Sequence, residues 1–483
     1  KGRLLWHTLN RQTQRKPGSR PMGFRIRQIE AESKFSSQLS LQAISRAVPP
    51  EAIEAVLAEH DAKEHRERKL NAFATVLLVV AMSIFAHLST AHVLKKIAQG
   101  LRYVYADPEV KVAGKAAISY RRYQLGARPL AALFRRVCRP LATPETPGAY
   151  LFGRRLMAID GTIEDVPDTA ENAAAFGRLH SHRGPAAFPQ VRAVYLAECG
   201  THAIVDAGFW PVHTGERKGA ERMLRSVEPG TLLMIDAGLY EYDLVQATVQ
   251  NESDLLGRLP GHVRPKLVQS LADGTYLAYI YPSEYRRRRD GEHLLVRVIE
   301  YTFDDPGRPG HGERHRLVTT LLAPQAYPAR ELICAYHERW EIEITIDEID
   351  THQRLLDRPL RSQRPVGVIQ ELYGLLIAHY AIRFLMHEAA LQAGVDPDRI
   401  SFTHALRVLQ DAVPEFEMTA PEQLACLYAR LLSDIADELL PARRNRINPR
   451  VVRRKMSNFK LKRPEHYHWP QPARPFRQAV VLI

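Results

Sequence analysis

The sequence predicts an α/β protein in which a mixed sheet follows an all-helical region and precedes further helices. Helical periodicity dominates residues 40–140, and short apolar runs rich in β-branched residues dominate residues 155–322. Helical patterns then return from 328 to about 440. Because 483 residues exceed what one hydrophobic core usually holds, two or three domains are expected.

The N-terminal part is expected to form a helical domain at residues 35–145, after a basic extension at 1–34. Pro49 and Pro50 open one of its helices, since proline is tolerated in the first helical turn. The turn-rich stretch 140–149 is typical of a domain boundary.

The middle of the chain changes to strand-like patterns bounded by Gly, Pro and Asp. A helix is expected at 215–227, between the third and fourth strands, and this order favours an α/β core with a mixed sheet. A β-rich insertion is expected at about 254–325. The expected strands of the core are 155–160, 188–198, 201–212 and 231–238.

The last third of the chain is expected to be helical and then basic. Long helices are predicted at 328–356 and 371–394, further helices at 396–440, and a basic C-terminal arm at 441–483.

The net charge of +13 is concentrated at the two ends of the chain. Residues 1–27 contain eight Lys and Arg, residues 441–463 contain ten, and neither stretch contains an acidic residue. A polyanion is the natural partner for such arms.

No nucleotide-binding glycine motif or nucleophile constellation is present, which disfavours a small-molecule substrate.

The four cysteines lie far apart and form no CxxC pair, so neither a disulfide scaffold nor a structural zinc site is expected. A reducing cytoplasm is the default compartment.

The apolar run 72–88 is at the short limit for crossing a bilayer, and its helical periodicity continues beyond it. We interpret this run as a buried core helix, and we expect no membrane span elsewhere.

Three carboxylates stand out by their position. Asp160 and Asp236 each end an apolar strand and precede small residues, and Glu343 lies in the long helix after the insertion. In open α/β sheets such strand ends form ligand sites. Two adjacent carboxylates repel each other unless a cation lies between them, and oxygen ligands suit Mg²⁺ or Mn²⁺. A pair of such metals clamps the attacking and leaving oxygens in phosphodiester chemistry.

The helix around Glu343 places Tyr336, Arg339, Asp350 and Arg354 on the same face at about 100° per residue. Arginine and tyrosine beside a metal-binding glutamate suit the binding of DNA phosphates. A solvated charged face is the alternative, although Trp340 and Ile342 indicate partial burial.

At these residues the chain resembles the insertion-element-4 family of bacterial DDE transposases. That family's signature is Tyr, two residues, Arg, three residues, Glu, six residues, Lys, and Tyr336, Arg339 and Glu343 match it. Asp160 in MAIDGT and Asp236 in MIDAGLY match the first two acidic motifs, and the resemblance spans roughly residues 35–465.

The resemblance implies an RNase H-like catalytic domain at 150–395, interrupted by the β-rich insertion, and a DNA-binding N-terminal domain. It implies that Asp160, Asp236 and Glu343 are catalytic metal ligands for Mg²⁺ or Mn²⁺, with Tyr336 and Arg339 on DNA phosphates. The substrates would be double-stranded element ends and target DNA, bound by a homodimer near the bacterial nucleoid.

One signature position departs from the family, because Asp350 stands where the family has Lys. Arg354, one turn later, is predicted to supply the missing DNA contact. Relatives that form hairpin intermediates use an aromatic wedge in the insertion, but no Trp lies between Trp210 and Trp340, so the route of second-strand cleavage stays open.

The C-terminal arm is the strongest candidate for binding the DNA backbone, because each phosphate contact releases counterions. A solvated charge run is the alternative. The predicted DNA-binding residues of the arm are Arg443, Arg444, Arg446, Arg450, Arg453, Arg454 and Lys455.

The sequence therefore predicts a transposase that cleaves DNA at element ends and joins them to a target. Two alternatives remain, a catalytically inactive DNA-binding regulator and a standalone metal-dependent nuclease with the same core. The His180/His182 pair, the arginine run 286–289 and Glu216 in HTGER are weaker candidates for metal, DNA and active-site roles.

Overall fold

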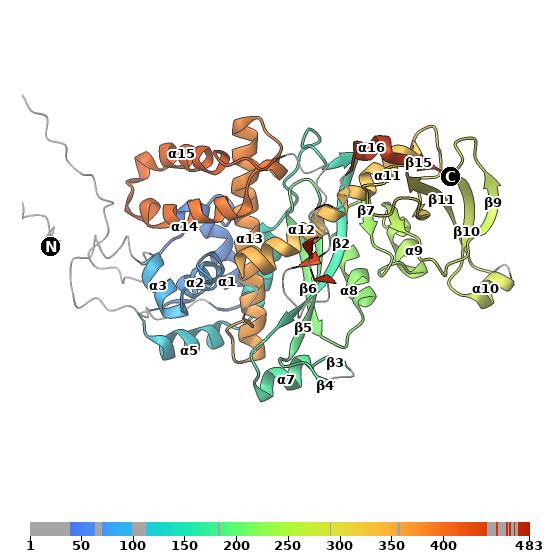
Figure 1. Cartoon of the computed structure of the whole chain (residues 1–483). Coiled ribbons are helices and arrows are strands. Elements are labelled where there is room, and N and C mark those ends of the chain that lie inside the picture. The colour runs from blue at the N-terminus through green and yellow to red at the C-terminus, as the bar shows by residue number, and fades with distance from the viewer. Residues whose placement is uncertain are drawn as a thin grey trace, which may run out of the picture.

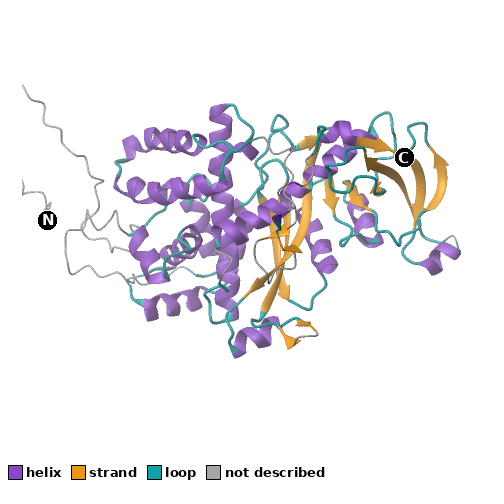
Figure 2. Cartoon of the chain, viewed as in Figure 1, coloured by secondary structure: helices purple, strands orange, loops and turns teal. Residues whose placement is uncertain are grey.

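The computed structural model describes residues 39–62, 70–98, 113–181, 184–289, 291–354, 358–441, 463–464, 468 and 472–483, and the backbone of two short strands at 451–452 and 460–461. Helices gather on one side of the molecule, and a long sheet runs from its centre to the other side (Figure 1, Figure 2).

The N-terminal part is helical, as the sequence predicts. It consists of η2 (Gln42–Ile44), α1 (Pro50–Glu59), α2 (Ala72–Ile84), α3 (Thr90–Ile97), α5 (Lys115–Leu125) and α6 (Arg128–Val137). The Asn71 side chain caps α2 by accepting a hydrogen bond from the amide of Ala74. Almost every residue of α2 is buried, so the apolar run is a core helix.

Helix α13 (Pro365–Ala393) is the central helix of this half of the molecule. A Cβ added at Gly374 would lie 2.7 Å from Val79 Cγ1, so the glycine permits a close crossing with α2. By length and composition alone α13 could cross a membrane, a feature that the sequence analysis overlooked. Because 83% of its most apolar window is buried, it fits a core helix equally well.

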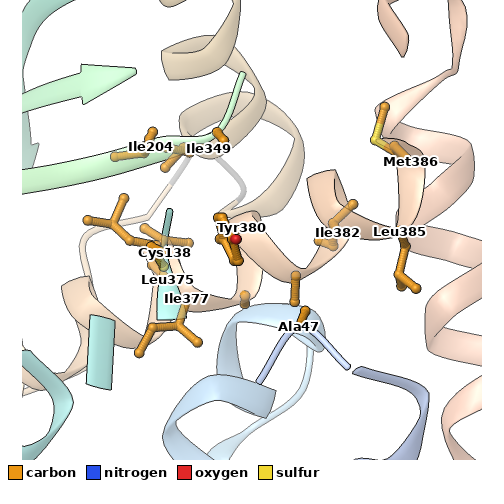
Figure 3. Packing of buried hydrophobic residues seen from close by; sticks show 14 of the residues in the cluster. Ala47, Cys138, Ile204, Ile349, Leu375, Ile377, Tyr380, Ile382, Leu385 and Met386 are labelled. Carbon is orange, nitrogen blue, oxygen red and sulfur yellow. The ribbon is translucent and has the colours of Figure 1, made fainter. Parts of the chain in front are cut away.

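The largest core cluster joins this helical half to the sheet. Ala47 from the N-terminal region, Ile349 from the π-helical segment at 348–353 and Ile204 from a strand all pack around the residues of α13 (Figure 3). Leu375, Ile377 and Tyr380 of α13 face this cluster, and all are buried. The helical half and the sheet therefore share one apolar core.

The sheet has eleven strands and combines parallel and antiparallel pairs, so the predicted mixed sheet is confirmed. Its main path runs β6-β5-β2-β7-β8-β12-β11-β10-β9, with β2 parallel to β7 and β7 parallel to β8. The first half comprises β1 (Tyr150–Leu151), β2 (Arg154–Asp165), β5 (Gln190–Glu198), β6 (Ile204–Pro211), β7 (Thr231–Ile235) and β8 (Asp254–Arg258).

Short helices lie between the strands of the core. They are α7 (Ala170–Phe176), α8 (Glu216–Met223), η3 (Leu224–Ser226) and α9 (Tyr242–Gln250), and a two-stranded ribbon of β3 (His180–Ser181) and β4 (Gly184–Pro185) follows α7. Helix α8 and η3 together match the helix expected at 215–227. Helices α7 and α9 were not expected.

The β-rich region continues the same sheet. It contains β9 (Lys266–Ser270), β10 (Tyr276–Ile280), β11 (Leu294–Phe303) and β12 (His315–Thr319), with the short helix α10 (Glu284–Arg288) between β10 and β11. Since β8 pairs with both β7 and β12, the core and the β-rich region share this strand. The arginine run 286–289 lies mostly on α10.

The end of the chain folds back onto the β-rich region. Helix α16 (Phe476–Ala479) leads into β15 (Val480–Leu482), which pairs with β11, and Asp305 accepts hydrogen bonds from the amides of Ala473 and Arg474. Phe476 stacks on His337 at 4.2 Å between ring centroids. Residues 472–483 are therefore part of the folded protein rather than of a free arm.

The remaining elements lie after the β-rich region. They are α11 (Ala329–Glu338), α12 (Trp340–Asp347), a π-helical segment (Glu348–Gln353), η5 (Pro397–Arg399), α14 (Phe402–Met418), η6 (Pro421–Gln423), α15 (Leu424–Ala436), β13 (Val451–Val452) and β14 (Lys460–Leu461).

The expected single helix at 328–356 was wrong. A tightened turn at Arg339 separates α11 from α12, and the chain widens to a π-helix after Asp347.

Candidate active site

The two aspartates come from neighbouring parallel strands. The paired positions of β2 and β7 end at Ala158 and Met234, and Asp160 and Asp236 each lie two residues further along. The expectation that Asp160 ends its strand was wrong, because β5 continues to pair with β2 as far as Asp165. Strand β7 ends at Ile235, so one edge of β2 becomes free at Asp160.

Asp160 lies in an electrostatically unfavourable position for a carboxylate. Burial raises its pKa to about 6, with further upward contributions from Asp236 and Glu343, whereas the amide of Gly161 and Arg339 act in the opposite direction. The Gly161 amide donates to Asp160 Oδ1 at 2.8 Å, and the Leu239 amide donates to Asp236 Oδ1 at 2.8 Å. The three acidic residues therefore share one site.

Arg339 connects the aspartates to the helix that carries Glu343. Its Nη2 donates to Glu343 Oε1 at 2.7 Å, and its Nη1 lies 3.5 Å from Asp160 Oδ2. The guanidinium also lies 5.8 Å from the centre of the Tyr336 ring. The Tyr336 hydroxyl donates to the carbonyl of Ile235 at 3.3 Å, directly before Asp236. Tyr336, Arg339 and Glu343 are thus gathered around the two aspartates.

The donor set fits a hard divalent cation. Asp236 and Glu343 both contribute to the raised pKa of Asp160, so the site needs added positive charge, and the single guanidinium of Arg339 supplies only part of it. Carboxylate oxygens are the ligands that Mg²⁺ and Mn²⁺ prefer. Glu343 keeps 35% of its side chain exposed, so this site is open to a substrate.

Comparison with known proteins agrees with this arrangement. Residues 38–135 match the model of the insertion element 4 transposase N-terminal region, and residues 151–380 match the transposase DDE domain. The chain belongs to the insertion-element-4 family of DDE transposases.

Two relatives from Escherichia coli (strain K12) show the extent of the similarity. The transposase InsG for insertion sequence element IS4 is 28% identical over 432 residues, which cover 88% of this chain and 95% of the relative. The putative transposase InsZ is 27% identical over 143 residues, covering 29% of this chain and 48% of the relative.

Among solved structures, the chain is similar to the piggyBac transposase in its synaptic complex with hairpin DNA. The TM-score is 0.40, the identity is 13%, and the match covers 83% of this chain and 85% of that one.

The transposase departs from its family signature at Asp350, and the structure shows what surrounds this residue. Asp350 Oδ2 lies 3.4 Å from Thr162 Oγ1 on β2, and burial raises its pKa to about 7. Arg354 Nη1 lies 3.9 Å from Asp350 Oδ1 and pairs closely with Glu164, whose side chain is fully buried. Only 11% of the Arg354 side chain is exposed, so its DNA contact stays a prediction that competes with this pairing.

A network of buried polar side chains contacts and stabilises α12, the helix that carries Glu343. The sequence analysis did not predict this network. His202 lies 2.7 Å from Glu341 and 3.2 Å from Glu348, and Glu348 pairs with Arg383 and His379 of α13. His202 has a positive φ of 59°, at the turn between β5 and β6. No signal in the sequence indicates that these separate segments meet, because only the tertiary fold brings them together.

One part of this network has a composition that could also hold a metal. His202, Glu341 and Asp398 offer ligand atoms within 4.8 Å of one another. The 2.7 Å separation between His202 Nε2 and Glu341 Oε2 is that of an ordinary hydrogen bond. We therefore interpret the cluster as a hydrogen-bonded support for α12.

The remaining predicted residues are placed as follows. The seven basic residues of the C-terminal arm lie outside the described residues, as do the extension 1–34 and His182. His180 lies on the short strand β3. Three tyrosines of the β-rich region are candidates for an aromatic wedge in place of a tryptophan, namely Tyr281, Tyr285 and Tyr301. Tyr301 is 6% exposed, Tyr281 is half-buried and Tyr285 is 58% exposed, so Tyr285 is the most accessible of the three.

Proposed function

We propose that this transposase cleaves DNA at the ends of its own element and joins the freed 3′ ends to target DNA. The observation that carries the proposal is the convergence of Asp160, Asp236 and Glu343 on one partly exposed site of a DDE domain. The metal ions would be Mg²⁺ or Mn²⁺, held by these three carboxylates. Such cations lower the pKa of bound water and stabilise charge on the phosphoryl oxygens.

In the cleavage step, the oxygen of a water molecule attacks the phosphorus atom at the element end. The bond from phosphorus to the 3′ oxygen breaks, the water loses a proton, and the 3′ oxygen gains one. Glu343, whose side chain is 35% exposed, would orient the water. In the joining step the freed 3′ hydroxyl attacks a target phosphodiester and displaces the target's own 3′ oxygen, so the number of phosphodiester bonds is conserved.

The basic residues around the site would position the phosphates. Arg339 lies between Asp160 and Glu343, with the centre of the Tyr336 ring 5.8 Å away, and we expect both side chains to contact the strand at the cleaved bond. Arg354 and the seven basic residues of the C-terminal arm would add further contacts. We further propose that the N-terminal domain at 35–145 binds DNA and that a homodimer pairs the two ends in the bacterial cytoplasm, at the nucleoid.

The experiment uses the purified protein, Mg²⁺ and a plasmid that carries the gene with its native flanking DNA. Excised fragments and joined 3′ ends are expected, and both should disappear in Asp236→Asn. Cutting without joining would instead indicate a nuclease. End-specific binding without cutting would indicate a regulator.

A further inference from the structure

A fourth carboxylate lies beside the three that match the family motifs. Glu216 is the first residue of α8, and residues 212–215 connect it to the end of β6. Its Oε1 occupies the space beside Gly161, whose backbone amide donates to Asp160 Oδ1 at 2.8 Å. Glu216 therefore lies against the residue that directly follows Asp160 on β2.

The identity of residue 161 supports this placement. A Cβ at Gly161 would lie 2.2 Å from Glu216 Oε1 and 2.9 Å from Glu216 Cδ. The backbone of Gly161 is not in the left-handed region, so a side chain at this position would displace the Glu216 carboxylate without straining the backbone. The Asp-Gly pair on β2 therefore leaves room for the carboxylate of α8.

The charges around Glu216 resemble those around Asp160. Burial raises the pKa of Glu216, Arg192 lowers it, and Asp236 raises it. Arg192 Nη1 lies 3.7 Å from Oε2, and Oε1 lies against Gly161. A glutamate that only stabilised the first turn of α8 could remain in solvent, away from like charges. Its place against Gly161 and near Asp236 therefore needs another reason.

We propose that Glu216 is a fourth carboxylate of the metal centre and contributes an oxygen ligand on the Asp160 side. This inference rests on the proposed function. It explains why an acidic side chain is directed at an acidic site and why residue 161 is a glycine. It also assigns a role to the HTGER segment at the start of α8.

The test measures Mn²⁺ binding by electron paramagnetic resonance, using the full chain bound to element-end DNA. Glu216→Gln keeps the side-chain size and should weaken the Asp236-dependent binding by at least about tenfold. Glu221→Gln, an exposed glutamate on the same helix, is the matched control and should bind as the wild type does. Thermal melting of each variant identifies any loss of folding.

A double-mutant cycle separates a metal ligand from a structural role. Gly161→Ala should displace the Glu216 carboxylate and weaken Mn²⁺ binding, but it should add little in a Glu216→Ala background, where nothing is left to displace. Wild-type Mn²⁺ affinity in Glu216→Gln, together with loss in Asp236→Asn, would overturn this inference alone. Mn²⁺ binding that did not depend on Asp236 would overturn the proposed function.

Discussion

At the scale of single residues, Asp160 is a carboxylate whose surroundings disfavour its charged form. Its raised pKa means that the folded protein binds this proton more tightly than the unfolded chain does. The free energy of unfolding of the metal-free protein should therefore decrease as the pH rises from about 4 to about 6.

Asp160→Asn should remove this cost. Above pH 6 the metal-free variant should be more stable than the wild type by on the order of 2 kcal/mol, since one pKa unit corresponds to about 1.4 kcal/mol. Urea unfolding in EDTA at pH 7 measures the difference. A variant that is less stable than the wild type would show that Asp160 has a supporting structural role instead.

Arg354, in contrast to Asp160, should stabilise the folded protein, because it pairs with Glu164, whose side chain is fully buried. Arg354→Ala should lower the free energy of unfolding by about 3 kcal/mol, since it leaves a buried charge without its partner. Adding Glu164→Gln should recover much of this loss. If Arg354→Ala left stability unchanged, the pairing with Glu164 would be unimportant and the DNA contact would be the better explanation of this residue.

At the scale of elements, the helix that carries Glu343 is held by the network around His202. Burial and Arg383 lower the pKa of His202, but Glu348 and Glu341 outweigh them, and the pKa rises to about 9. Asp398 and His379 are the other titratable groups of this network. The stabilisation that protonated His202 gives to the folded protein is fully present below pH 6.5 and should be lost as the pH rises through about 9.

Removing the arginine of this network should be costly. Arg383→Gln leaves Glu348 buried with less compensation, and we expect a loss of about 3–5 kcal/mol in unfolding free energy. Arg430→Gln, which removes a pair whose arginine is 72% exposed, should change stability by less than about 1 kcal/mol. Equal effects of the two substitutions, measured by urea unfolding, would contradict the supporting role of the network.

The sequence predicted these elements well where the signal was local. Strands β2, β5, β6 and β7, helix α2 and the spacing of Tyr336, Arg339 and Glu343 follow from apolar periodicity and short motifs. The break at Arg339 and the π-helix after Asp347 were missed, because their geometry depends on contacts with β2 and α13. The extension of β2 past Asp160 was missed because pairing with β5 sustains it.

At the scale of the whole molecule, the positive charge at the chain ends should control DNA affinity. Replacing Arg443, Arg444, Arg453 and Arg454 by Ala should make the salt dependence of DNA binding shallower, by about 0.9 in log–log slope per lost phosphate contact. Fluorescence anisotropy across a range of salt concentrations measures the slope. An unchanged slope would mean that the arm does not touch the backbone.

The overall architecture combines predictable and unpredictable parts. The order of a helical region, a mixed sheet, a β-rich region and further helices could be predicted from the sequence. The pairing of β15 with β11, the shared strand β8 and the approach of Glu216 to Asp160 could not, because each joins segments that are distant in the chain and carry no pairing signal.

The central claim is that Asp160, Asp236 and Glu343 hold the catalytic metal, and joining of a pre-cut element end to target DNA tests it most directly. The wild type should join with either Mg²⁺ or Mn²⁺, and Asp236→Asn should join with neither. Asp236→Cys should join only with Mn²⁺, because a thiolate is a poor ligand for Mg²⁺ and Mn²⁺ accepts softer donors. Mg²⁺-supported joining by Asp236→Asn at the wild-type rate would contradict the account.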